Sequence, residues 1–276
     1  MRKYGKNINS EEAWDQMAKN YSDQLISPYH NHRLAVINSL IPEDLYRKGK
    51  KIFDFGCGDA LHFVQFLKRG CLISGIDISA EMITFAKQRL SQMNLDQDLA
   101  NIGGVADLAS LESNSLDAIL SFNVLAYLTN EEENVFYREA ARLLRPGGYL
   151  IVTHSNELFD LYSMNQYTVD FLGRHLVSDE SLRSSLSTLV TQVTESQSIS
   201  TYNVRENPLA YKYKLQRYGF SETRQEFINL HVAPPPLLEK DKFYPDTLFW
   251  KEEEKWKLMF ICSTYGSLSV RELLES

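Results

Sequence analysis

The stretch FDFGCGDA, Phe53 to Ala60, decides the fold. It closes an apolar run from Lys50 to Gly56 with two glycines one residue apart, which predicts a buried strand that leads into a tight turn. A dinucleotide-binding loop would read GxGxxG, but Leu61 stands in place of the third glycine, and no GK[ST] follows as in a P-loop. Acids flank the loop at Asp54 and Asp59, so we expect a loop for a ligand with a cationic group rather than a pyrophosphate.

Strand-like and helix-like segments alternate on either side of this loop. Further strands are predicted at residues 71–77, 102–107, 116–122 and 149–155, with helices between them at 60–70, 79–93 and 129–148. Two adjacent glycines weaken the strand at 102–107. This alternation predicts an α/β fold, a doubly wound parallel sheet with helices on both faces.

The alternation stops after Ser155. Residues 156–206 are polar and rich in serine and threonine, which predicts an inserted, mainly helical lobe or lid after the fifth strand. A helix at 207–220 and strands at 221–231 and 257–265 then complete the sheet. We therefore divide the chain into a ligand-binding core with an N-terminal helix (1–155), the lobe (156–206) and the C-terminal part of the core (207–276).

Composition and charge narrow the class of protein. A net charge of −7 over 276 residues, with a pI near 5.5, argues against a nucleic-acid partner. Cys57, Cys71 and Cys262 show no CxxC spacing, and His30 and His32 form only a weak pair, so no metal site is predicted. The polar N-terminal segment and the short apolar runs predict a cytoplasmic protein with no membrane partner.

Acids end two successive predicted strands. Asp77 follows the loop by about 20 residues, where a carboxylate can bind both hydroxyls of a ribose. Asp107 ends the next strand and is expected to accept a hydrogen bond from an adenine amino group. The pattern favours an adenosine-type cofactor over a purely structural turn. Of these acids, Asp54 is expected to orient the amides of the loop rather than to touch the ligand.

In its order of motifs the chain resembles the class I S-adenosylmethionine-dependent methyltransferases. The matching pieces are FDFGCGD, GIDIS, GVADL, SFNVLAYL and LLRPGGYLIV, preceded by AWDQMAKNYSD, and the resemblance covers Trp14 to Ser155. It implies a Rossmann-like seven-stranded sheet with the last strand antiparallel, and S-adenosyl-L-methionine as the cofactor.

The resemblance also implies cofactor contacts. Tyr21 is expected as the aromatic lid, Cys57 takes part through its backbone only, and the doubled glycine makes the register around Asp107 depart from the pattern. The predicted cofactor-binding residues are Tyr21, Gly56, Cys57, Gly58, Asp77, Ile78, Met82, Asp107, Leu108, Phe122 and Asn123.

Methyl acceptors differ widely within this family. SFNV lacks the prolines of the Asn/Asp-Pro-Pro motif of DNA and protein-glutamine N-methyltransferases, so those substrates are not expected. Asn123 is expected either to orient a polar group of the cofactor or acceptor or to act as a helix N-cap. His154 ends the fifth strand and is the first candidate for a general base, against the alternative of a histidine that is hydrogen-bonded at the junction with the lobe. Tyr127 and His231 are further catalytic candidates.

TYNVRENPLAY gathers hydrogen-bonding groups before the helix that rejoins the core. Tyr202, Asn203, Arg205 and Asn207 are predicted to bind substrate, against the alternative of a helix cap with surface charges. The sequence favours a methyltransferase that acts on O or N of a small polar metabolite or sugar, with homodimerisation possible. The alternative is a non-catalytic regulator that binds the same cofactor; a nicotinamide dehydrogenase is disfavoured by the missing third glycine.

Overall fold

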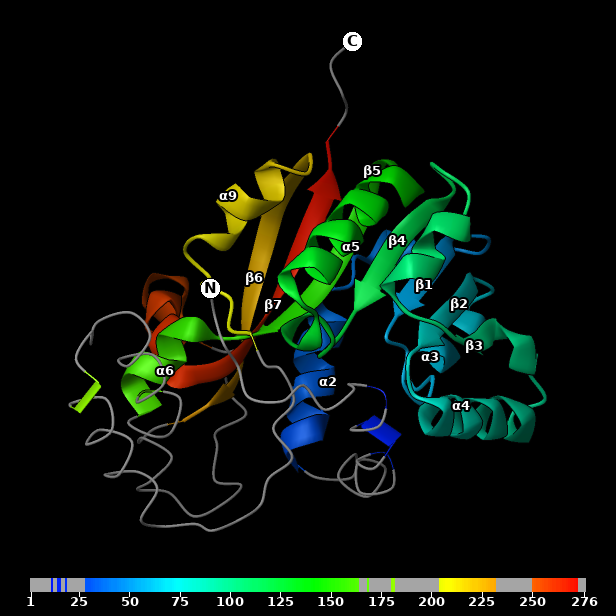
Figure 1. The fold of residues 1–276 in the computed structure, drawn as a ribbon, viewed down its shortest axis with the longest axis horizontal. Coiled ribbons are helices and arrows are strands. Elements are labelled where there is room, and N and C mark those ends of the chain that lie inside the picture. Colours follow the sequence, from blue (N-terminus) through cyan, green and yellow to red (C-terminus); the bar gives the residue numbers. More distant parts are fainter. Residues whose placement is uncertain are drawn as a thin grey trace.

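One seven-stranded sheet organises the chain. The computed structural model describes residues 11, 14–15, 18, 28–163, 168, 180–181, 204–231 and 250–272 (Figure 1). The strands are β1 (Lys51–Phe55), β2 (Leu72–Asp77), β3 (Ala100–Ile102), β4 (Leu116–Ser121), β5 (Leu144–Ser155), β6 (Phe220–Leu230) and β7 (Cys262–Arg271). They lie in the order β3-β2-β1-β4-β5-β7-β6.

The strand directions confirm the predicted α/β sheet. Strands β1 to β5 pair in parallel, whereas β7 runs antiparallel to both of its neighbours, β5 and β6. The chain order reverses direction between β1 and β4, so the carboxyl ends of these strands meet beside a switch point. In an open sheet of this kind, ligands bind outside the carboxyl ends of the strands at that point.

Helices cover both faces of the sheet (Figure 1). The helices are α2 (Pro28–Leu40), α3 (Phe63–Leu67), α4 (Ala80–Gln92), α5 (Asn130–Leu143), α6 (Glu157–Ser163), α9 (Tyr211–Gln216) and α10 (Leu258–Ile261). Alternate strand residues point to opposite faces: Ile52 packs with the α2, α3 and α4 side, and Phe53 packs with α5 and α9. Both faces are therefore apolar, as expected for a parallel sheet that is buried on each side.

The third and last strands are misplaced, and the fifth strand begins at Leu144 instead of at Tyr149, because α5 ends at Leu143. The third strand ends at Ile102, and Val105–Ser110 form a 3-10 helix (η3) instead of the predicted strand end. The last strand begins only at Cys262, because Glu252–Lys257 form a 3-10 helix (η7) that continues into α10. Both shifts occur where a short helix occupies residues that have no strict alternation of apolar and polar side chains.

The base of the predicted lobe is described, and most of the lobe lies outside the described residues. Helix α6 follows β5 directly, and Asn156 pairs with Glu206 in an isolated parallel bridge where the chain returns. Within the described part of the chain, no helix is both long and apolar enough to cross a bilayer. The same residues contain no group of three or more His, Cys, Asp or Glu side chains placed to hold a metal ion.

Candidate functional site

The glycine loop after β1 adopts a conformation that its two glycines make possible. Gly56 has a φ of +77°, and a Cβ there would lie 2.1 Å from Cγ2 of Val124; Gly58 has a φ of +53°. The amides of Gly56 and Cys57 both donate to the carbonyl of Ile76, at 2.8 and 3.0 Å. With these amides used inside the fold, the loop offers no cradle of N–H groups for a pyrophosphate.

Asp77 joins this loop to the first turn of α4. Its Oδ2 accepts from the Gly58 amide and its Oδ1 from the Ser79 amide, both at 2.9 Å. Burial raises the pKa of Asp77, while these two hydrogen bonds oppose the shift. The carboxylate is therefore held in place at the carboxyl end of β2, where it faces a pocket.

The two acids that flank the loop do not face that pocket. Asp59 pairs with Arg89 of α4, which compensates its charge. Asp54 is 1% exposed, and among the described residues its carboxyl oxygens have no hydrogen-bond partner. Burial, reinforced by the charges of Asp77 and Asp59, raises the pKa of Asp54 to about 8. Both acids line an adjoining cavity together with Gly56 and Gly58, so their role toward a cationic group of the ligand stays a prediction.

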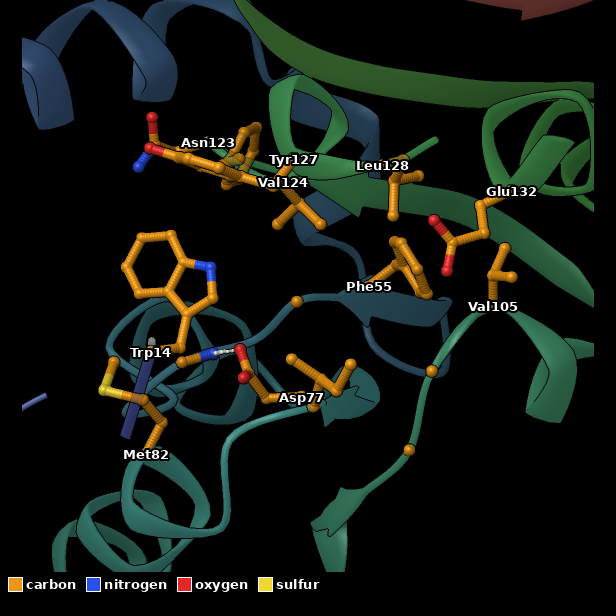
Figure 2. Close-up of a pocket in the computed structure, with 16 residues that line it drawn as sticks. Trp14, Phe55, Asp77, Met82, Val105, Asn123, Val124, Tyr127, Leu128 and Glu132 are labelled. Carbon is orange, nitrogen blue, oxygen red and sulfur yellow. Dashed lines mark hydrogen bonds between the residues drawn. The ribbon is translucent and has the colours of Figure 1, made fainter. Parts of the chain in front are cut away.

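The pocket lies over the carboxyl ends of β1, β2 and β4 (Figure 2). Its cavity volume is about 210 Å³, and the pocket opens to solvent. Trp14 and Asn123 lie at one end, Val105 and Glu132 lie at the other, and Asp77 lies between the two ends. The lining residues are Trp14, Phe55, Gly56, Gly58, Asp77, Ile78, Met82, Gly103, Gly104, Val105, Phe122, Asn123, Val124, Tyr127, Leu128 and Glu132.

Trp14 supplies an aromatic wall from the N-terminal segment. Its ring meets the ring of Tyr127 edge to face, with centroids 4.9 Å apart. The neighbouring Asp15 accepts a 2.5 Å hydrogen bond from the Ser79 hydroxyl, which attaches this segment to the start of α4. Tyr21, the predicted aromatic lid, lies outside the described residues, and among those described it is Trp14 that supplies the aromatic ring of this segment to the pocket.

Several predicted cofactor residues line the pocket. Ile78 and Met82 form its floor beside Asp77, and Phe122 lies at the end of β4. Asn123 has a φ of +63°, and its amide donates to the Thr153 hydroxyl at 2.8 Å. It does not cap the short helix that follows, because that helix begins after Val124 without a side-chain cap. The left-handed backbone, which asparagine tolerates better than most residues, turns the chain across the pocket.

Three predicted cofactor residues do not line this pocket. Asp107 is exposed, and its Oδ2 accepts from the Gly104 amide at 2.8 Å, so it caps η3. Leu108 is 1% exposed and packs in the core against α5. Cys57 lines an adjoining cavity with Gly56 and Gly58, and its thiol is buried in the core on the side of α2, α3 and α4. The early end of β3 explains the first two corrections, since Gly103, Gly104 and Val105 form the pocket wall instead.

The structure places His154 in the core and not at the pocket mouth, where it was predicted. Along β5 its side chain has the same parity as Leu150 and Val152, and these point into the core on the α5 side. Its ring lies 4.4 Å from that of Tyr211 and 5.1 Å from that of Tyr265, and it is 4% exposed. It is therefore a buried histidine on the α5 side of the sheet and is not among the residues that line the pocket.

A buried neutral histidine makes stability depend on pH. Burial, with a smaller contribution from the charge of Lys214, lowers the pKa of His154 well below its usual value. The neutral ring of His154 contributes fully to the free energy of unfolding above the unfolded-state pKa of about 6.5. This contribution is lost as the pH falls below that value, because the unfolded chain then binds a proton at this residue more readily than the folded protein does. The loss is up to about 1.4 kcal/mol for each pH unit.

We expect His154→Phe to reduce this acid sensitivity. Urea unfolding at pH values from about 7.5 down to about 5 should show the free energy of unfolding of the variant falling less steeply than that of wild type. The other histidines are present in both proteins, so their contributions cancel in the difference. Parallel curves for the two proteins would show that His154 is not held neutral by burial.

The other catalytic and substrate candidates lie on the same edge of the sheet. Tyr127 lines the pocket. His231 follows β6, where its Nε2 is 3.3 Å from the Ser263 hydroxyl and burial lowers its pKa. Arg205 lies on the returning segment, and the Oδ1 of Asn207 accepts from the Leu209 amide at 3.0 Å in the turn before α9. Tyr202 and Asn203 lie outside the described residues.

Sequence reasoning missed several residues of the site. Val105, Val124, Leu128 and Glu132 line the pocket, and Arg33 of α2 lines an adjoining cavity together with Gly56 and Gly58. Arg33 is 9% exposed, and no sequence pattern identified it as part of the site. Glu132 carried a signal, because T-x-x-E before an apolar run marks the first turn of a helix.

Comparison with known proteins identifies relatives of this architecture. A family model described as a methyltransferase domain matches residues 53–152. A ubiquinone biosynthesis O-methyltransferase of Coxiella burnetii is 25% identical over 155 residues, which is 55% of this chain and 61% of that relative. A protein of the same name from Xanthomonas oryzae pv. oryzae is 25% identical over 128 residues, or 46% and 52% of the two chains.

Solved structures share the fold. A Haloferax volcanii putative methyltransferase, in complex with the Trm112 methyltransferase activator, has a TM-score of 0.60 at 17% identity, covering 96% of this chain and 99% of that one. Magnesium protoporphyrin IX methyltransferase from Synechocystis PCC 6803, with bound SAH, has a TM-score of 0.58 at 14% identity, covering 95% and 98%.

Proposed function

The chain carries a methyltransferase domain of the class I S-adenosylmethionine-dependent family, and on this premise we propose that it transfers the methyl group of S-adenosyl-L-methionine to O or N of a small polar metabolite or sugar. The chain spans 61% of the length of the Coxiella relative, so this proposal extends beyond the aligned part. The observation that carries it is the pocket built around Asp77 and the Gly56–Gly58 loop.

This pocket fits a nucleoside better than a dinucleotide. Asp77 presents a carboxylate at the carboxyl end of β2, which suits the two hydroxyls of a ribose. The amides of Gly56 and Cys57 donate to the carbonyl of Ile76, so they are not available to bind a pyrophosphate. Ile78 provides an apolar surface at the end of β2 against which a flat base can pack.

The methionine part of the cofactor would lie toward the end of the pocket that is away from Glu132. Arg33 lines the adjoining cavity with Gly56 and Gly58, and its guanidinium suits a carboxylate. When bound, S-adenosylmethionine supplies an electrophilic methyl group on a sulfonium centre. Trp14 and Tyr127 wall the end of the pocket away from Glu132, where they would exclude water and orient an acceptor.

The acceptor site is proposed between this end of the pocket and the segment 156–206, taken as an inserted lid. The segment leaves the sheet at Asn156 and returns at Glu206, and these two residues pair with each other. On the return, the Val204 amide donates to the carbonyl of Ala126 at 2.6 Å, beside the lining residue Tyr127. Arg205 belongs to the same return, which supports its proposed role in substrate binding, whereas the side chain of Asn207 caps the turn before α9.

Calorimetry with S-adenosylmethionine, S-adenosylhomocysteine and NAD tests the cofactor. We expect dissociation constants of about micromolar order for the first two, and no heat above dilution for NAD. A protein that binds NAD and neither adenosyl compound would contradict the proposal. If both adenosyl compounds bind, methyl transfer from labelled donor to sugars, amines and lipophilic phenols then separates the acceptor classes, and binding without transfer to any acceptor would favour the non-catalytic regulator.

A further inference from the structure

The far end of the pocket lacks the acid that was expected there. Asp107 caps η3 and is exposed, and the pocket wall at this end consists of Gly103, Gly104 and Val105. Among the described lining residues, Asp77 and Glu132 are the two carboxylates. Figure 2 shows the Glu132 carboxylate beside Val105, at the opposite end from Trp14, with Asp77 between them. A base that extends from a ribose at Asp77 away from Trp14 therefore points toward Glu132.

The start of α5 holds Glu132 in this position. Its Oε2 accepts from the amide and from the hydroxyl of Thr129, both at 2.8 Å, while the Glu132 amide donates to that hydroxyl at 3.2 Å. This capping box satisfies the first turn of the helix and fixes the side-chain rotamer. It uses one carboxylate oxygen, and within the described part of the chain Oε1 has no hydrogen-bond partner.

We propose that Glu132 is the specificity residue for the adenine base, with Oε1 accepting a hydrogen bond from the exocyclic amino group. The inference rests on the proposed function and assigns a role in that same pocket to a residue of α5 rather than of β3. Ile78, Val105 and Leu128 supply apolar surface around the base, so the carboxylate would distinguish adenine, whose 6-position donates, from hypoxanthine, whose 6-position accepts. Binding of hypoxanthine would place two acceptors against each other without a donor, and this lowers the affinity for the ligand.

Glu132→Gln is the cleanest variant for a test, because glutamine also forms a capping box. Its carbonyl oxygen can replace Oε2 against Thr129, which leaves the NH₂ group facing the base where Oε1 now lies. Glu131→Gln is the matched control: it removes the same charge from the same helical turn, and Glu131 is exposed and outside the lining residues. Asp107→Asn tests the earlier assignment.

The probes are S-adenosylhomocysteine and S-inosylhomocysteine, measured by calorimetry on the four proteins. For Glu132→Gln we expect S-adenosylhomocysteine to bind about 10-fold more weakly and the inosine analogue to bind at least as well as to wild type, as for a lost hydrogen bond to a charged group. The preference for adenine should stay within about 2-fold of wild type in Glu131→Gln and Asp107→Asn. Thermal unfolding of each variant checks that α5 remains capped.

The possible failures differ from one another. If wild type binds S-adenosylhomocysteine and Glu132→Gln keeps the wild-type preference for adenine, the assignment of Glu132 is overturned and the proposed function stands. A preference lost in Asp107→Asn instead would return the adenine contact to the region after β3. If wild type binds neither probe, the proposed function fails and this inference fails with it.

Discussion

Replacing Asp77 with asparagine is expected to weaken S-adenosylhomocysteine binding by about 100-fold. The carboxylate accepts from the amides of Gly58 and Ser79 through separate oxygens. Asparagine has one carbonyl oxygen, so its NH₂ group would face one of these N–H donors and push the loop or the first turn of α4 away. The variant would lose the carboxylate proposed for the ribose and the geometry of the loop at the same time.

Calorimetry on the two proteins measures this effect, with Asp107→Asn as the matched control. Asp107 is exposed and lies outside the lining residues, and asparagine keeps a carbonyl oxygen that can accept from the amide of the lining residue Gly104, so the control removes one acidic charge nearby and retains this contact. Its affinity should remain within about 2-fold of wild type. An Asp77→Asn variant that binds as tightly as wild type would remove Asp77 from the cofactor site.

Gly56→Ala is expected to lower both the stability and the cofactor affinity. A Cβ at this position would lie 2.1 Å from Cγ2 of Val124, and the φ of +77° is unfavourable for any residue with a Cβ. The two effects together should lower the free energy of unfolding by about 2–4 kcal/mol. Because Val124 lines the pocket, its displacement should also weaken S-adenosylhomocysteine binding by about 10-fold or more.

Gly219→Ala separates the two causes. Gly219 has the same φ of +77°, but nothing lies within 4 Å of its Cβ position. It should lose only about 1 kcal/mol of stability, which is the cost of the backbone conformation, and keep its affinity for the cofactor. Urea unfolding and calorimetry on both variants give the comparison. Equal losses of stability in the two would mean that the contact with Val124 contributes nothing.

The order of the elements could be predicted from the sequence because local patterns specify it. Apolar runs that end in Gly56 and in Asp77 identified the neighbouring strands β1 and β2, of which β1 borders the switch point between β1 and β4. The third strand was misplaced, since the doubled glycine at Gly103 and Gly104 carries no alternation from which a register can be read. That error moved Asp107 into the site and left Val105 out of it.

His154 was misassigned for a related reason. The sequence places it near the end of β5, but the face on which it lies depends on the register of that strand within the sheet. Leu150 and Val152 point toward α5, so His154 does as well, and it packs against Tyr211, which the chain supplies some 57 residues later. A contact at that separation has no signal in a single sequence.

The sequence by itself therefore determined the α/β sheet, the glycine loop and the place of Asp77, because each follows from residues that are close together in the chain. Only the tertiary structure decided which side chains meet in the pocket. Trp14, Val105 and Glu132 come from three separate segments, and their convergence depends on how helices and strands pack rather than on local preference. Side-chain direction is set by register and by helix rotation, and these are fixed when distant elements bury their apolar faces against one another.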